Sequence, residues 1–422
     1  MRHASRWFLS GFPLLFCLAC GNGNPAAATP TTTVHAQTVK EMVDSLPPAG
    51  GTVVLGTGTW PSGYNSDFIS KPNVTIQGSG NPGYNSNFTA MTGGTIVLGR
   101  LAASSGADYF TVRNLGVDVG SAYVNENDGS VPLDGLVIFN NGEIVGAPQV
   151  QSPTIENVSC LGYSTLAPVH CMLVENVNHA TISNVTTVMN QHGLAFKGTN
   201  STVDGVYARG HGIDSVTLKS DDYAPSRTDT LTNITVHYLL TPGDTKGIIL
   251  RGAETGLNDI NVSNVATEGT IGWGIRVIGA DSTSPATAIN FSKVTIDYSG
   301  GSPAGNYCMM LVDYVGDINI SSLNCSNMWA GIAAFLPSSE ALASFTVNCS
   351  QFADIATNAI QTYGAWNISN TSFDSVGGSG IFNLSGLTVI SGDTFTNIGG
   401  SDWDAAGGTF AFSPALSGCP ST

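Results

Sequence analysis

Short apolar runs separated by Asn, Gly, Ser and Thr recur along the chain from residue 38 onward. In one recurring segment, two apolar residues stand two positions apart and a cation follows at once. Residues two apart in a strand lie on the same face, so the apolar pair predicts an inward face and the cation an outward one. The segments are HGLAFKG, DSVTLKS and KGIILRG, with cations at Lys197, Lys219 and Arg251.

A second motif, as in PTIENV and INVSNV, has a central apolar residue and ends on Asn or Gly. An inward strand of the first kind starts twelve or thirteen residues later, as from Ile182 to Leu194 and from Val203 to Val216. Whole repeats return after roughly 21 to 32 residues, which is typical of a solenoid whose coils bury their apolar faces by stacking. The terminal Asn favours a left-handed turn. These turn candidates are Asn114, Asn157, Asn184, Asn264 and Asn370, with Gly205 replacing Asn once.

The composition supports a repetitive β structure. The 422 residues include 51 glycines, with 42% hydrophobic and only 10% charged residues, which excludes a disordered chain. The formal net charge is −16 and no basic nucleic-acid motif is present, so we expect no nucleic-acid partner. Against this acidic background, seven of the twelve Lys and Arg residues beyond the first nineteen positions lie between Lys197 and Arg276.

The N-terminus predicts export. Arg2 and Arg6 precede an apolar run from Trp7 to Ala19, which is too short for a permanent membrane anchor. We expect a signal peptide over residues 1–19 and a flexible tether over residues 20–36. FCLACGNGN resembles a bacterial lipoprotein cleavage site with Cys20 as the lipidated residue, and a conventional cut nearby is the alternative. The protein would then be secreted or an outer-membrane lipoprotein, contacting a membrane only through this lipid.

Six cysteines remain beyond the signal, and an even number in an exported chain predicts disulfides of undetermined connectivity. LNCSN and VNCSQ align as neighbouring repeats, which would place Cys325 and Cys349 one above the other. No CxxC pair remains, which argues against a cysteine-based metal site. The six are Cys160, Cys171, Cys308, Cys325, Cys349 and Cys419.

The segment TVKEMVDSLPPAGGTVVLGTGTW, followed by ISKPNVTIQGSG, resembles the N-terminal cap of pectate-lyase-like right-handed parallel β-helix proteins. In that superfamily an amphipathic helix closes the apolar end of the solenoid. Here it is expected from about Thr38 to Leu46, with Val39, Met42 and Val43 on its apolar face. The resemblance implies an all-β, single-stranded parallel β-helix domain over residues 37–422. It leaves the activity open, because the superfamily holds lyases, hydrolases, epimerases and phage adhesins.

The three aligned cations would form a column on the outside of this β-helix. Like charges in a column are costly unless negative charge binds to them, so the column predicts an acidic polysaccharide or oligosaccharide as partner. The alternative is that each cation pairs with a nearby carboxylate. Glu175 takes the cation's place in one repeat, and Arg276 lies two residues earlier in another. A second column, at the start of these strands, contains His170, His192, Asp214, Lys246 and Trp273.

β-Elimination from a uronate polysaccharide is the first chemistry that fits these columns. Lys219 is the candidate base, because a lysine between other cations has a lowered pKa. Arg251 would neutralise the uronate carboxylate, since Arg suits bidentate contacts. Aromatic residues flanking the charged centre would stack on sugar rings. The expected substrate-binding residues are Lys197, Arg276, His192, Glu175, Lys246 and Trp273.

Hydrolysis by paired carboxylates is the second chemistry, as in polygalacturonase-like enzymes of the same fold. KSDDY and GHGID resemble that family's paired Asp and its Gly-His-Gly. The resemblance implies that Asp214, Asp221 and Asp222 are the acid and base, supported by His211 or His192. The family's Asn-Thr-Asp and Arg-x-Lys motifs are absent, and the Gly-His-Gly precedes the Asp pair here. A non-catalytic glycan-binding adhesin is the third hypothesis.

Calcium is the one cofactor that the sequence suggests. Asp221 and Asp222 follow the cationic strand directly and could hold Ca²⁺ together with Glu175 or Glu254. The protein is expected to act as a monomer or a homotrimer.

Overall fold

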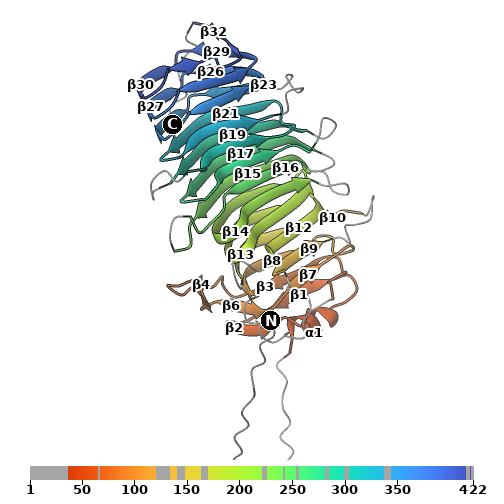
Figure 1. The fold of residues 1–422 in the computed structure, drawn as a ribbon. Coiled ribbons are helices and arrows are strands. Elements are labelled where there is room, and N and C mark those ends of the chain that lie inside the picture. Colours follow the sequence, from red (N-terminus) through yellow and green to blue (C-terminus); the bar gives the residue numbers. More distant parts are fainter. Residues whose placement is uncertain are drawn as a thin grey trace, which may run out of the picture. The chain divides into compact units, whose positions relative to one another are not determined.

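Strands that lie one coil apart in the chain pair in parallel, so that each coil rests on the coil before it. The computed structural model describes residues 37–64, 67–119, 134–139, 148–162, 170–220, 226–240, 243–252, 256–280, 285–298, 304–336, 344–414 and 419. Within this part, strands stack along one axis from orange to blue in Figure 1, and one short helix is present. The expected all-β parallel β-helix is confirmed.

The strands fall into two long series and a few short pieces. β13 (Thr181–Thr199) and β14 (Thr202–Ser220) bend and contribute to both series. The first series continues as β9 (Leu136–Phe139), β12 (His170–Asn178), β16 (Ile248–Gly252), β18 (Trp273–Ile278), β20 (Tyr307–Val312), β22 (Ala330–Phe335), β25 (Ile360–Tyr363), β28 (Ile381–Ser385) and β31 (Trp403–Asp404). The second contains β1 (Gly51–Val54), β3 (Val74–Gln77), β8 (Thr111–Asp118), β11 (Thr154–Leu161), β15 (Ser226–His237), β17 (Leu257–Glu268), β19 (Ala286–Asp297), β21 (Ile318–Ser326), β23 (Ser344–Asn348), β24 (Gln351–Ile355), β26 (Ala365–Ser369), β27 (Ser372–Val376), β29 (Leu387–Ser391), β30 (Thr394–Ile398) and β32 (Thr409–Phe412). The short pieces are β2 (Gly58–Pro61), β4 (Gly83–Tyr84), β5 (Met91–Thr92), β6 (Thr95–Leu98), β7 (Leu101–Ala103) and β10 (Val150–Gln151).

The predicted cap helix is present as α1 (Val39–Asp44), one residue shorter than expected at its start and two residues shorter at its end. Thr38 and Glu41 form a capping box, in which each side chain accepts a hydrogen bond from the other's backbone N–H. Val39 and Val43 are buried against the core, and Figure 1 shows α1 beside β1 at the red end of the solenoid. No helix of the described residues is long and apolar enough to cross a membrane.

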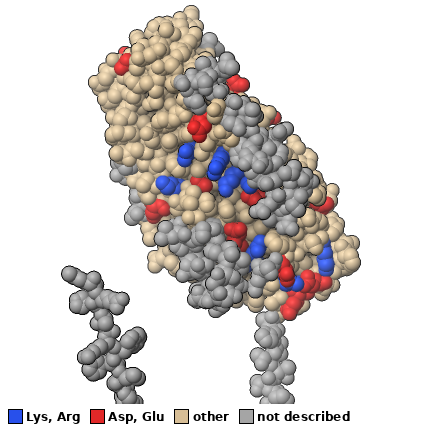
Figure 2. Space-filling model, turned by 45° about the vertical axis from the view of Figure 1, so that its right-hand side comes forward, with Lys and Arg blue, Asp and Glu red and all other residues tan. Residues whose placement is uncertain are grey.

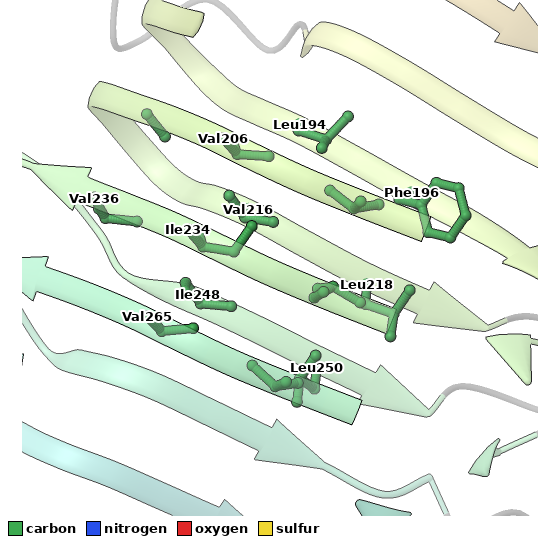
Figure 3. Packing of buried hydrophobic residues seen from close by; sticks show 14 of the residues in the cluster. Leu194, Phe196, Val206, Val216, Leu218, Ile234, Val236, Ile248, Leu250 and Val265 are labelled. Carbon is green, nitrogen blue, oxygen red and sulfur yellow. The ribbon is translucent and has the colours of Figure 1, made fainter. Parts of the chain in front are cut away.

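The apolar pairs of the repeated segment point into the core, as the alternation predicts. Leu194 with Phe196 of β13 and Val216 with Leu218 of β14 are each no more than 1% exposed. Figure 3 shows these side chains between the two strand series, facing residues of the opposite series such as Ile234, with Val206, Val236 and Val265 nearby. Burying one such side chain contributes about 1.5–3 kcal/mol, so the stacked pairs hold adjacent coils together.

The Asn residues that end the second motif form corners with left-handed backbone. Asn114 and Asn157 have φ of 57° and 52°, and Gly205 at the equivalent corner has φ of 72°. The Asn157 amide nitrogen donates to the Asn114 side-chain oxygen at 2.8 Å, so the corners of successive coils are linked. The corner at Asn157 is a single residue inside a continuous strand, whereas Asn370 directly follows the end of β26, as the motif suggested. All five turn candidates have positive φ, and the remaining three are Asn184, Asn264 and Asn370.

Replacing Asn157 with alanine is expected to lower the free energy of unfolding by about 1–2 kcal/mol. Alanine tolerates the left-handed backbone poorly and cannot form the side-chain hydrogen bond to Asn114. Denaturant titration measures the change. Asn157→Gly is the matched control, because glycine restores the backbone preference without the hydrogen bond. Equal losses in both variants would contradict a backbone contribution at this corner.

All six cysteines beyond the signal form disulfides, as the even number predicted. The pairs are Cys160–Cys171, Cys308–Cys325 and Cys349–Cys419. The expectation that Cys325 and Cys349 stack is wrong. Cys325 pairs in register with Phe352, while the register of the flanking residues places Cys349 opposite Ser322.

Candidate functional site

The three aligned cations lie beside one another on the outside of adjacent strands. Lys219 pairs in register with Arg251, and Phe196 pairs with Leu218, which puts Lys197 next to Lys219. Their apolar neighbours point inward, so the cations point outward. The predicted column is confirmed, and we call the outward surface of β12, β16, β18 and the second halves of β13 and β14 the cationic face. Figure 2 shows basic side chains gathered on one face near the middle of the molecule, with acidic side chains among them.

Only some cations of this face have carboxylate partners. The Nζ of Lys197 lies 3.0 Å from Oε1 of Glu175, and these two side chains are 13% and 14% exposed. The alternative of paired charges therefore holds for Lys197. Within the described residues, no carboxylate lies at ion-pair distance from Lys246, Arg251 or Arg276. Like charges on neighbouring strands are costly, so this part of the face is suited to an anion.

Lys219 lies in the column between Lys197, which has a carboxylate partner, and Arg251. Burial lowers the pKa of its ammonium group; Glu175 raises it, Lys197 lowers it, Asp214 raises it and Arg251 lowers it. The predicted direction is confirmed, but burial is the main cause and the neighbouring cations contribute less. Because Glu175 and Asp214 both act on Lys219, carboxylates from both columns belong to one electrostatic site.

The second column also has the expected register. His170 pairs with His192, and His192 pairs with Asp214. The Nδ1 of His192 lies 3.3 Å from Oδ2 of Asp214, which is close enough for an ion pair. The two groups are not aligned as a hydrogen bond. Asp214 is only 5% exposed, and its Oδ1 has no hydrogen-bond partner. A buried carboxylate oxygen without a partner is unusual in a protein, which singles out Asp214 among the described acidic residues of this face.

Trp273 holds cations at its ring. The Nζ of Lys246 lies 5.2 Å from the ring centroid, and the Cζ of Arg276 lies 5.0 Å from it. Such cation–π contacts fix the positions of the two side chains. Tyr307 follows Trp273 on the next coil and contacts Phe335 edge to face, with ring centroids 5.9 Å apart. The aromatic surface available for a sugar ring therefore extends to Tyr307, which sequence reasoning did not single out.

His192, and not His211, contacts Asp214. His211 is completely buried, and its ring nitrogens lie within hydrogen-bond distance of the carbonyl oxygens of Thr187 and Asn190. Burial lowers the pKa of His211 to about 4, which keeps the ring uncharged at neutral pH. The Gly-His-Gly segment thus fills the interior at the bend of β14. It resembles a catalytic motif in sequence, but its histidine is buried away from the cationic face.

Three predicted residues, Asp221, Asp222 and Glu254, lie outside the described residues. The paired-Asp and calcium hypotheses therefore stay predictions. Within the part of the chain that the structure describes, no group of three or more His, Cys, Asp or Glu side chains could hold a metal ion. Glu175, the remaining proposed calcium ligand, is bound by Lys197 and would have to leave this ion pair to coordinate a metal.

Asp134 is a site residue that sequence reasoning missed. It stands two residues before Leu136, which pairs in register with Met172, so Asp134 begins the column that continues through His170. Its Oδ1 accepts a hydrogen bond from the backbone N–H of His170 at 2.6 Å and lies 3.1 Å from Nδ1 of the ring. The segment LDGLVIF could have identified it, because Asp134 stands two residues before the inward Leu136, just as His192 stands two residues before Leu194.

Solved catalytic domains of GH87 alpha-1,3-glucanases are similar to this chain. One, in complex with tetrasaccharides, has a TM-score of 0.55 and 13% sequence identity, covering 95% of this chain and 70% of that chain. Another, in complex with nigerose, has a TM-score of 0.54 and 16% identity with the same coverage. The catalytic unit of a thermostable enzyme from Streptomyces thermodiastaticus strain HF3-3 has a TM-score of 0.54 and 16% identity, covering 90% of this chain and 71% of that chain.

These likenesses bear on the fold. No family model matches the chain, and no curated protein matches it in sequence. At such low identities a structural likeness shows the fold alone, and it supports the right-handed parallel β-helix expected from the cap and the repeats.

Proposed function

We propose that this protein is an exported carbohydrate-active enzyme that hydrolyses glycosidic bonds of a polysaccharide on the cationic face. The structurally similar proteins named above are glycoside hydrolases, and two of them are described in complex with oligosaccharides. A shared fold does not by itself carry an activity, so the proposal depends on the side chains of the face.

Asp214 is the observation that carries the proposal. Glycosidases commonly use two carboxyl groups flanking the scissile bond. Asp214 supplies a nearly buried carboxylate whose Oδ1 has no partner, next to His192 and within electrostatic reach of Lys219. The second carboxyl group comes from Glu175 or from the adjacent pair Asp221 and Asp222. Structures of the similar glucanase domains with tetrasaccharides include alanine variants at two consecutive aspartates. This supports the adjacent pair Asp221 and Asp222 as a candidate source of the second carboxyl group.

The substrate in this proposal is acidic. Lys246, Arg251 and Arg276 have no carboxylate partner among the described residues, and the Trp273 ring holds two of them in place. Guanidinium groups match carboxylates in a bidentate geometry, so a uronate or another anionic sugar suits this cluster. The expected consequence is faster cleavage of a uronate polymer such as polygalacturonate than of a neutral α-1,3-glucan.

β-Elimination is the second candidate, and one observation favours it. The lowered pKa of Lys219 increases the fraction of its amine that is neutral and able to remove a proton from the sugar. Lys219 would then be the base and Arg251 the group that neutralises the uronate.

Product analysis separates the candidates. The protein is incubated with polygalacturonate, alginate and α-1,3-glucan, and both reducing ends and unsaturated-uronate absorbance are followed. We expect new reducing ends without the absorbance. A rise in absorbance would replace hydrolysis with elimination, and binding without any product would favour the adhesin. Loss of activity with a chelator, restored by Ca²⁺, would support the calcium hypothesis for Asp221 and Asp222.

A further inference from the structure

Two aspartates and two histidines occupy successive coils of the second column. In order along the axis they are Asp134, His170, His192 and Asp214. The rings of His170 and His192 stack with centroids 4.5 Å apart and an interplanar angle of 20°. Each histidine therefore has an imidazole on one side and an aspartate on the other, an arrangement that limits how either ring can turn.

Each imidazole faces its aspartate through the same nitrogen. The Nδ1 of His170 lies 3.1 Å from Asp134, and the Nδ1 of His192 lies 3.3 Å from Asp214. A carboxylate at Nδ1 favours a proton on that nitrogen, so Nε2 is the nitrogen that can exchange a proton with another molecule. The contact of His192 with Asp214 is not aligned as a hydrogen bond, and catalytic contacts often align only when substrate binds.

The two Nε2 atoms differ in their surroundings. The Nε2 of His170 is buried and has no hydrogen-bond partner, so a substrate cannot reach it. The two side chains are similarly exposed, at 19% for His170 and 16% for His192, but the Nε2 of His192 is not among the buried atoms without partners. Of the two rings, His192 is the one whose Nε2 opens onto the cationic face.

We infer that His192 donates the proton to the leaving glycosidic oxygen. Asp214 positions the His192 ring for this step, together with the ring of His170 that stacks on it and is itself held by Asp134. The inference rests on the proposed hydrolysis, but it replaces Asp214 with His192 as the proton donor. Asp214 was an acid or base in the sequence analysis and one of the two carboxyl groups in the proposed function. Asp214 becomes a positioning residue that stabilises the charged imidazole.

The step balances in protons and bonds. The protonated ring gives its Nε2 proton to the glycosidic oxygen as the bond from that oxygen to the anomeric carbon breaks. A water oxygen bonds to the anomeric carbon, and its proton goes to a carboxylate of the cationic face. That carboxylic acid then loses its proton to solvent, and solvent returns one to His192. The carboxylates of Asp134 and Asp214 are the acidic neighbours of the two rings, and Lys246, two residues before β16, is the cation on the next coil. His211 behind the ring is uncharged.

Kinetics of three variants test the assignment on whichever of the three polymers the wild type cleaves. We expect His192→Asn to lower kcat at least about 100-fold with little change in KM, because a general acid contributes about 10²–10⁴-fold. Asp214→Asn should lower kcat with little change in KM, since the ring of His192 loses the carboxylate that positions it. His179→Asn is the matched control, because His179 is exposed at a turn with positive φ where asparagine is tolerated.

Two outcomes overturn the inference and are distinguishable from failure of the proposed function. If the wild type cleaves a polymer and His192→Asn keeps kcat within about threefold, only the role of His192 fails. If the wild type cleaves none of them, the proposed function fails as well. Nitrogen-15 NMR of the imidazoles gives a readout independent of activity. At alkaline pH both rings should carry their proton on Nδ1, and a proton on Nε2 of His192 would contradict the assignment.

Discussion

Replacing Lys219 with methionine is expected to lower kcat/KM by about 100- to 1,000-fold, the usual effect of removing one electrostatic group from an active site. Methionine has a similar length and fills the same space without the charge. The ammonium group interacts electrostatically with the carboxylates of Glu175 and Asp214 on a largely buried part of the cationic face. Its loss should therefore change the charge seen by the substrate while leaving the core of β14 in place.

The thermal midpoint separates this effect from misfolding. Lys219→Met should unfold within a few degrees of the wild type, because removing a buried ammonium also removes its desolvation cost. Lys293→Met is the matched control, since Lys293 lies at a corner of β19 away from the cationic face. Unchanged turnover in Lys219→Met would show that the face is not the site of the reaction.

Replacing Asp229 with asparagine is expected to stabilise the protein by about 2–4 kcal/mol near pH 8 and to have little effect near pH 4. Asp229 on β15 is fully buried, and its Oδ1 accepts a hydrogen bond from the backbone N–H of Ser201 at 2.9 Å. Its Oδ2 has no partner, and burial raises its pKa from 3.8 to about 8. Asparagine keeps the acceptor and cannot ionise.

The sign of the pH dependence follows from the raised pKa. Below about pH 4 the Asp229 side chain is protonated in both the folded and the unfolded protein, so it costs nothing. Between about pH 4 and pH 8 the unfolded chain releases the proton while the folded protein keeps it, so the free energy of unfolding falls as pH rises. Denaturant titrations across this range measure the slope. Asp229→Asn should remove it, whereas exposed Asp259→Asn should not; equal slopes in wild type and Asp229→Asn would contradict the raised pKa.

Much of the fold was predictable because the repeat is local. The alternation around Leu194 and Phe196 specified an inward face, and the Asn at positions such as Asn157 specified the corners. The cap helix followed from its apolar face and from the resemblance of its segment to the cap of known β-helix proteins. The cysteine pairs were not predictable, because the register that sets Cys325 against Phe352 depends on how neighbouring coils align in space.

The candidate site was predictable in position and less so in its contacts. A period of two placed Lys197, Lys219 and Arg251 in one column. Asp134 was missed because more than thirty residues separate it from His170, longer than the other spacings in its column. The ion pair of Lys197 with Glu175 and the packing of cations on Trp273 depend on side-chain conformations that a sequence pattern does not specify.

The most direct test is a crystal structure of Asp214→Asn with an oligosaccharide of the cleaved polymer bound. We expect the sugar rings to cross the outward surfaces of β13, β14, β16 and β18, with a glycosidic oxygen next to His192 and an anionic group near Arg276. The result that would contradict the account is an oligosaccharide bound elsewhere. One such place is the cavity of about 530 Å³ on the other strand series, lined by residues including Asn324, Gln351 and Ser372.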